Sequence, residues 1–260
     1  MYLNILKDLL LVNRSTLRKT AKLFLNNWVI VFTGFAYTLF NIALLIVVNI
    51  LFRIPIIGFF SGIISFIATS AMISNFLYLI NQIIRYGRIT FQDFKEGFTV
   101  YLWKVYGVLF IGWVASFLFE RIIGAFIYSI NLTYAGAMSF IINLLILILL
   151  NALPESIYQK HYSAWETVMY AFNFVKENWI EWFVPNIIML GAFYLVTGNV
   201  IRDVLAISSG YFYSYSMRGI VLYIIGQIMF SFIMIYRGIL FDTLSTSTRR
   251  KRAYMHHLYK

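Results

Sequence analysis

Long stretches without any charged residue constrain this chain more than any other feature of its sequence. Five such stretches cover positions 28–52, 55–84, 122–154, 182–201 and 219–236. A helix of about 20 apolar residues crosses the roughly 30 Å hydrocarbon core of a bilayer. Since every stretch is close to this length or longer, the sequence predicts an integral membrane protein.

The stretches predict six membrane-spanning helices. Residues 122–154 are long enough for one span and part of another, and region 104–129 has the character of a span although Glu120 and Arg121 interrupt it. The predicted spans are 28–52, 55–84, 104–129, 132–154, 181–201 and 217–241. The predicted fold class is therefore all-α, a polytopic membrane protein in which residues 1–260 form a single integral membrane domain.

The composition argues against several classes of function. Hydrophobic residues make up 61% of the chain and charged residues 12%, whereas a soluble domain carries about 25% charged residues. This excludes a soluble globular protein and argues against a nucleic-acid partner. The absence of cysteine removes thiol catalysis, Cys-type zinc sites and Fe–S clusters. Because the common catalytic motifs are also missing, the sequence predicts no enzyme, metal or cofactor.

The distribution of lysine and arginine predicts the orientation of the chain. Of its 21 Lys and Arg residues, only Arg53, Arg121, Arg202 and Arg218 fall on one side of the predicted spans. Positive residues favour the cytoplasmic side, so both termini are expected in the cytoplasm and the protein in the plasma membrane. A basic cluster in the C-terminal tail is expected to contact anionic lipid. It consists of Arg249, Arg250, Lys251 and Arg252.

Three similar segments predict an internal repeat of about 76 residues. Each begins with a residue that favours helix N-caps, namely Ser15, Thr90 or Ser163. Each continues as an amphipathic segment and ends in a tryptophan where a span begins, at Trp28, Trp103 and Trp179. We predict repeat units at 13–87, 88–161 and 162–243, with a basic tail at 244–260. Each unit has a surface helix and a hairpin of two spans, so a pseudo-threefold bundle is expected.

The amphipathic segments predict helices that lie in the headgroup plane. Within 90–103, apolar residues recur every three to four positions, with polar residues on the opposite side. Two roles are open for these helices. They could anchor the bundle, or they could form a collar that docks a partner or senses lipid.

Three amides within the predicted spans are candidates for a polar tier. Asn75, Asn151 and Gln227 are each 76 residues apart, so the repeat would place them at one height. There they could line a polar path or hydrogen-bond one another. Alternatively they hold neighbouring helices together, an ordinary use of amides in membranes.

Charged residues close to the spans are a second group of candidates, because ionisable groups in a membrane are costly. Glu120 and Arg121, like Arg202 and Asp203, are expected near the outer boundary, either as structural ion pairs or on a substrate or proton path. Glu155 follows Pro154 at the cytoplasmic end of the fourth span, where it could act locally or be solvated.

Two segments resemble bacterial membrane families. They are LPESIYQKHYSAWETVMYAFNFVKENW at 153–179 and FQDFKEGF at 91–98. Both resemble patterns in poorly characterised six-span integral membrane families, including the membrane domain of glycerophosphoryl diester phosphodiesterases. The resemblance implies a membrane part alone, because residues 1–260 leave no room for the soluble catalytic domain of that family. The phosphodiesterase activity is therefore not expected here.

Three functional hypotheses follow from the sequence. The first is a non-enzymatic scaffold or accessory protein whose partners are membrane lipids or a membrane protein complex. The second is a small transporter or channel with a polar path near Asn75, Asn151 and Gln227. The third is the membrane half of a split lipid-related enzyme.

Overall fold

The computed structural model describes residues 2–53, 60–119, 121, 132–201, 203–209 and 217–247. Within these ranges the chain forms helices and no strand, which confirms the all-α fold class. All four residues of the predicted basic cluster, Arg249, Arg250, Lys251 and Arg252, lie outside the described residues, as do Glu120 and Arg202.

Within the described ranges, six helical segments are long and apolar enough to cross a membrane, so the chain is a multi-pass membrane protein. The 3-10 helix η1 (Trp28–Phe32) and α2 (Thr33–Leu51) form the first, and α4 (Ser61–Tyr86) and α6 (Leu102–Phe119) are the second and third. The fourth, Phe140–Gln159, combines most of α8 (Leu132–Leu149) with α9 (Leu153–Gln159). The last two are α11 (Trp179–Thr197) and α12 (Met217–Thr246).

The predicted fourth span at 132–154 is interrupted. The α8 helix ends at Leu149, a turn follows, and α9 begins at Leu153 with Pro154 in its first turn. Proline has no N–H to donate, so it fits the first turn of a new helix far better than a helix interior. As a result Glu155 belongs to a separate short helix rather than to the end of a straight span.

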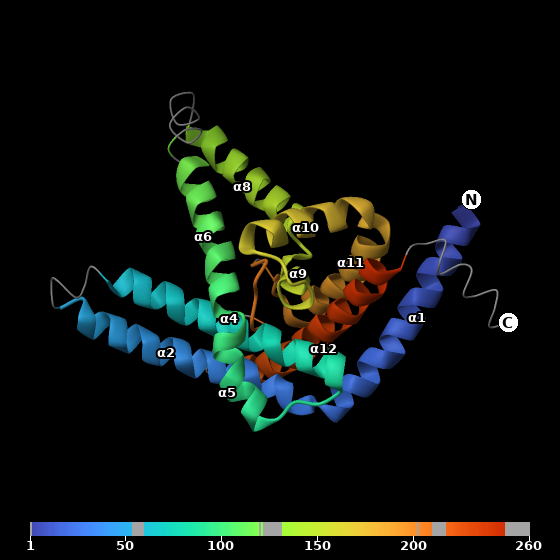
Figure 1. Cartoon of the computed structure of the whole chain (residues 1–260), viewed down its shortest axis with the longest axis horizontal. Helices are drawn as coiled ribbons and strands as arrows, with labels where there is room; N and C mark the ends of the chain where they lie inside the picture. Colours follow the sequence, from blue (N-terminus) through green and yellow to red (C-terminus); the bar gives the residue numbers. More distant parts are fainter. Residues whose placement is uncertain are drawn as a thin grey trace.

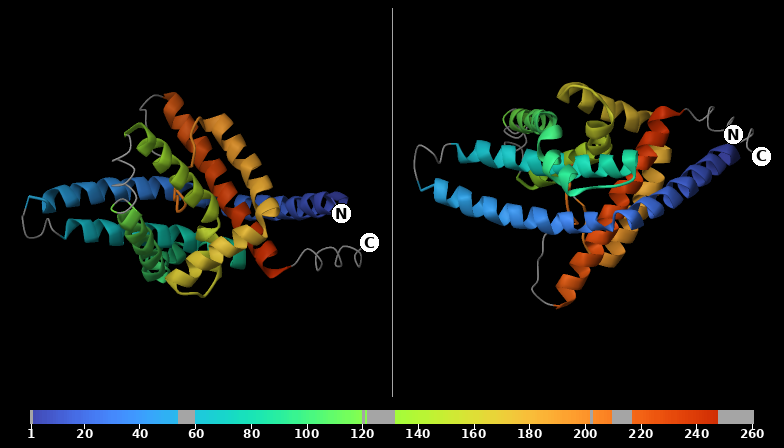
Figure 2. Two further views of the ribbon diagram at one scale, coloured as in Figure 1. Left: turned by 90° about the horizontal axis from the view of Figure 1, so that it is seen from above. Right: turned by 60° about the horizontal axis from the view of Figure 1, so that its bottom comes forward.

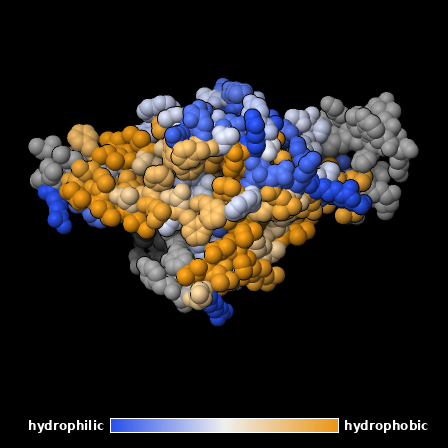
Figure 3. Space-filling model, turned by 90° about the horizontal axis from the view of Figure 1, so that it is seen from below, coloured by the Kyte–Doolittle hydropathy of each residue, from blue (hydrophilic) through white to orange (hydrophobic). Residues whose placement is uncertain are grey.

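The paired spans point away from one another instead of lying parallel. In Figure 1, α2 and α4 extend to the left, and α6 and α8 extend upward. Figure 2 shows α11 and α12 leaving in a third direction. Around the short helix α9 the near ends meet, whereas the outer parts expose many large apolar side chains. In Figure 3, hydrophobic residues cover the protruding parts at the left and bottom, while hydrophilic residues gather along the top.

A helix precedes each of the three pairs of spans, as the repeat predicts. These helices are α1 (Tyr2–Asn26), α5 (Phe91–Val100) and α10 (Ala164–Glu177), and α1 packs along α12. The element order therefore follows the predicted units, while the repeat itself stays a prediction.

Two of the three predicted N-caps are confirmed. Thr90 and Asp93 form a capping box at α5, and Ser163 and Glu166 form one at α10. The bonds from the Ser163 backbone and hydroxyl stabilise the ionised form and lower the pKa of the Glu166 carboxyl. The expectation for Ser15 is wrong, because it lies inside α1 and its hydroxyl donates to the Val12 carbonyl. No proline or glycine precedes it, so the helix continues through it.

Close packing and hydrogen bonds fix α5 against α4. The Ser74 hydroxyl donates to the Gly97 carbonyl at 2.7 Å and accepts from the Tyr101 backbone N–H at 2.8 Å. A Cβ added to Gly97 would lie 2.9 Å from Nδ2 of Asn75 and 3.1 Å from its Cα. Glycine at this position is what lets the surface helix lie directly on the span.

Replacing Gly97 by valine should therefore push α5 away from α4. Overpacking of this kind costs about 1–3 kcal/mol, so thermal unfolding of the purified protein in detergent should begin at a lower temperature. Gly112→Ala on α6 is the matched control, because an added Cβ there meets no atom within 4 Å. An unchanged melting temperature in Gly97→Val would contradict the close contact.

Candidate functional site

The chain between α11 and α12 turns back into the molecule. The α11 helix ends at Thr197, and Gly198 follows in the left-handed conformation at φ 69°. The re-entrant segment, as residues 199–201 and 203–209 are called here, is not helical. Its apolar side chains pack against the main core. Thr197 and Ser209 both approach Gly226, so the segment leaves and returns at the same level of α12.

Gln227 holds the returning end of this segment. Its Oε1 accepts a hydrogen bond from the Ser209 backbone N–H at 2.9 Å, and both residues are buried. On its other side the carboxamide lies against Gly34 of α2, where any Cβ would collide with it. Backbone that is not helical survives at membrane depth only when protein buries it or when it lines a cavity. Gln227 supplies one of the bonds that this requires.

A small, mostly apolar cavity lies against the re-entrant segment. It has a volume of about 50 Å³ and is partly open. Most of its walls are apolar side chains of α8, α11 and α12, and its polar lining comes from Asn151, Asp203 and Arg237. Two predicted candidates, Asn151 and Asp203, therefore meet at one site.

Arg237, which lines the cavity, forms a buried ion pair with Glu155. The Arg237 Nε donates to Oε1 of Glu155 at 2.7 Å, and its Nη2 donates to Oε2 at 3.1 Å and to the Asn151 carbonyl at 2.5 Å. Glu155 is fully buried and Arg237 is 7% exposed. A buried charge is costly unless it is paired and hydrogen-bonded, and here both conditions are met. Glu155 is thus a structural partner of Arg237 rather than a solvated residue.

Trp182 completes the surroundings of the ion pair. The guanidinium of Arg237 lies 5.2 Å from the centre of the Trp182 ring, within the range of a cation–π interaction. The indole N–H donates to Oδ1 of Asn151 at 2.9 Å. Trp182 thereby joins α11 to both Asn151 and Arg237.

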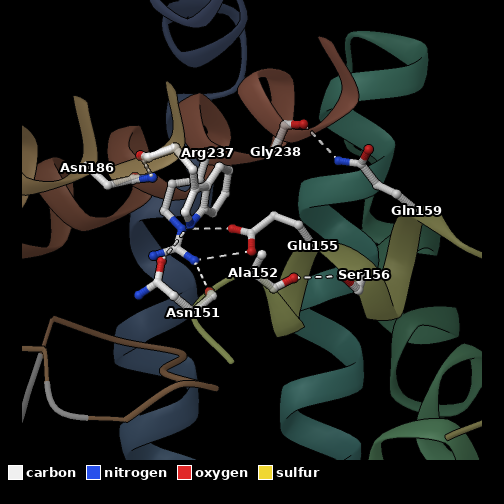
Figure 4. A network of polar contacts seen from close by, with 9 residues as sticks. Asn151, Ala152, Glu155, Ser156, Gln159, Asn186, Arg237 and Gly238 are labelled. Carbon is white, nitrogen blue, oxygen red and sulfur yellow. Dashed lines mark hydrogen bonds and ion pairs between the residues drawn. The ribbon is translucent and has the colours of Figure 1, made fainter. Parts of the chain in front are cut away.

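The short helix α9 places Glu155 and clamps α12. Glu155 lies in its first turn, where the helix dipole favours a negative charge. At the other end of α9, Gln159 donates to the Gly238 carbonyl at 2.7 Å, as Figure 4 shows. Gly238 has no room for a Cβ, because Ile84 and Tyr158 pack directly against it. The clamp therefore requires glycine at this point of α12.

Lys104 fixes the far end of α9 to α6. Its Nζ donates to the Ile157 carbonyl at 2.8 Å and to the Lys160 carbonyl at 2.6 Å. A cation at a helix C-terminus satisfies carbonyls that have no partner within the helix. The orientation of Glu155 thus depends on two neighbouring helices as well as on its own.

The third amide of the predicted tier lies at a different junction. Asn75 accepts from the Tyr37 hydroxyl at 2.7 Å and donates to the Phe94 carbonyl at 2.5 Å. It therefore joins α2, α4 and α5. The hydrogen bonds of Asn151 and Gln227 also go to other partners rather than to one another.

Arg121 lies away from this site. It is exposed, and its guanidinium lies 5.5 Å from the centre of the Phe117 ring on the same chain segment. The candidates Glu120 and Arg202 fall outside the described residues.

Two residues of the site do not stand out in the sequence. Arg237 counts there only as one of many basic residues, and Trp182 as one of several aromatic residues. The spacing of the repeat places Arg85 at the position that corresponds to Arg237, yet Arg85 is exposed. The sequence did contain a signal that could have identified Arg237, because it is the only charged residue between 219 and 241.

No group of three or more potential metal ligands occurs among the described residues. Comparison with protein-family models, curated proteins and solved structures gives no match. The resemblance to the phosphodiesterase membrane domain therefore stays a prediction.

Breaking the ion pair should be far more damaging than removing it. Arg237→Met leaves Glu155 buried without a partner and should cost about 3–5 kcal/mol, whereas the double variant Arg237→Met/Glu155→Leu should recover much of that loss. Unfolding of the purified protein in detergent measures both. Arg85→Met is the control on an exposed arginine, and it should change stability little. A double variant as unstable as the sum of the two singles would contradict the pairing.

Proposed function

We propose that the protein is a non-enzymatic scaffold or accessory protein of the plasma membrane, which interacts with lipids and with a membrane partner at its cytoplasmic side. The observation that carries this proposal is the exposure of large aromatic residues where the surface helices meet the spans. Trp103 is 73% exposed and Trp179 is 60% exposed. Tryptophan is enriched at the membrane–water interface, where its amphipathic ring is stable.

The use of the polar residues supports a structural role. Asn75 joins three helices, and Asn151 binds Trp182 while its carbonyl binds Arg237. Gln227 binds the re-entrant segment. A conduction path needs polar groups that face an open passage, whereas the hydrogen bonds of these amides hold helices and loops together.

The re-entrant segment favours a second candidate, which is transport. Irregular backbone that lines a cavity is typical of substrate sites in transporters, and Asn151 lines such a cavity here. The two candidates differ in what the purified protein does in a sealed vesicle.

The proposed orientation can be tested by labelling, because the chain contains no cysteine. Single cysteines at the exposed positions Lys95 and Lys176 should react with a membrane-impermeant maleimide only after the cells are permeabilised. Cysteines at Arg53 and Arg218, which are also exposed, should react in intact cells. Labelling of all four positions in intact cells would contradict the proposed orientation.

Contact between the surface helices and lipid can be tested with brominated phospholipids, which quench nearby tryptophan. In vesicles of these lipids, Trp165→Phe should reduce the quenchable part of the emission, because the proposal places this exposed ring among the headgroups. Trp182→Phe is the control. Its ring is fully buried, so its removal should reduce the quenchable part less than Trp165→Phe does.

Two results would overturn the scaffold proposal. One is a Trp165 emission that brominated lipid does not quench, which would place α10 away from the membrane. The other is solute flux through vesicles that contain the purified protein, with loss of that flux in Asn151→Leu. The second result would establish the transport candidate instead.

A further inference from the structure

The cavity beneath the re-entrant segment contains hydrogen-bond donors that the protein itself does not use. Arg237 binds its protein partners through Nε and Nη2. Its Nη1 has no hydrogen-bond partner among the described residues, although the side chain is 93% buried and lines the cavity. Figure 4 likewise shows no contact from the side-chain nitrogen of Asn151 to the residues drawn. Both groups are donors, so the complementary ligand atom is an acceptor such as a phosphate oxygen.

A negative group lines the same cavity. Asp203 is exposed, and the ion pair of Arg237 is formed with Glu155 and not with Asp203. A ligand that contacts both ends of this cavity meets donors at Arg237 and a carboxylate at Asp203. A simple anion matches only the first requirement, and a simple cation matches only the second. A zwitterion with a phosphate and a protonated amine matches both.

The remaining walls are apolar and favour a ligand that has an apolar part. They are formed by Leu147 of α8, Leu190 of α11, Ile233 and Met234 of α12, and apolar residues of the re-entrant segment. In Figure 1 the pair α6 and α8 points in a different direction from α11 and α12, and the lining of the site comes from α8, α11, α12 and the re-entrant segment. Large apolar side chains of these helices are exposed, among them Leu144 on α8 and Ile187 on α11, and such a surface favours an acyl chain over a free, fully hydrated solute.

The depth of the site agrees with that of a lipid headgroup. Trp182, which contacts Arg237, lies one turn along α11 from the exposed Trp179. One helical turn rises roughly 5 Å. If Trp179 lies at the interface, as tryptophans at span ends commonly do, the guanidinium lies just below the headgroups of the nearer leaflet.

We propose that this cleft binds an aminophospholipid, with its phosphate against Arg237 and Asn151, its primary ammonium against Asp203, and an acyl chain between the diverging spans. The inference rests on the proposed function, since it names the lipid class that the scaffold holds. Phosphatidylethanolamine has this headgroup. Phosphatidylglycerol lacks the ammonium, and the quaternary ammonium of phosphatidylcholine has no N–H to donate to a carboxylate.

The full-length protein in detergent, incubated with an equal mixture of these three phospholipids, provides the test. Lipid that stays bound after gel filtration is quantified by mass spectrometry. We expect phosphatidylethanolamine to exceed each of the other two about tenfold, as one additional charge-assisted hydrogen bond would give. Equal retention of all three lipids, or retention of none, would overturn the proposal.

Two substitutions separate the halves of the headgroup. Asp203→Asn should reduce the preference for phosphatidylethanolamine over phosphatidylcholine about tenfold, because the carboxylate that receives the ammonium is lost. Asn151→Asp keeps an oxygen for the Trp182 indole and replaces the free donor by a carboxylate oxygen, so retention of all three lipids should fall. Asp242→Asn on α12 is the matched control, because Asp242 is exposed and outside the cleft. It should behave as the unaltered protein does.

Two further measurements distinguish the possible failures. Soluble phosphoethanolamine should not displace the bound lipid, and displacement at matched concentration would identify a ligand without an acyl chain. If brominated lipid quenches Trp165 while the three lipids are retained equally, the proposed function stands and the specific site does not. If neither effect is seen, both proposals fail.

Discussion

A buried guanidinium in a chain with few charges must be surrounded by partners, and this requirement organises the centre of the molecule. Arg237 on α12 is paired with Glu155 on α9 and contacts Trp182 on α11. Lys104 on α6 binds the opposite end of α9. Removing two charges from water is expensive, and the ring of additional hydrogen bonds offsets that cost. The helix α9 therefore connects the second pair of spans to the third.

The first pair is connected by close packing instead. Gly34 allows α2 to approach Gln227 of α12, and Gly97 allows α5 to lie on α4. In hydrocarbon, apolar burial does not favour one helix neighbour over lipid, so small residues and hydrogen bonds decide which helices associate. These contacts are concentrated at the near ends of the spans. The outer parts share few of them, which explains why they diverge and leave apolar surface for lipid.

The charge-free stretches, the helical periodicity and the N-cap residue types were enough to predict the six spans and the N-caps of α5 and α10. These features depend on local residue patterns. The candidates Asn151, Glu155 and Asp203 were identifiable as polar groups out of place. Their partners were not, because the contact between Arg237 and Glu155 joins residues 82 positions apart. The re-entrant segment was equally hidden, since 181–201 was expected to be a continuous span and the backbone bond from Ser209 to Gln227 leaves no pattern in the sequence.

The residues that line the cleft also hold the helices together, so a bound ligand would affect how the helices associate. Asn151 faces the cavity while its own carbonyl and side-chain oxygen hold Arg237 and Trp182 in place. A ligand that binds only the folded arrangement stabilises it by mass action. A lipid in this cleft would contact α8, α11, α12 and the re-entrant segment together, and so would link the spans that diverge most. Binding of lipid in the cleft would therefore favour the arrangement of spans seen here, and a change in that arrangement would weaken lipid binding.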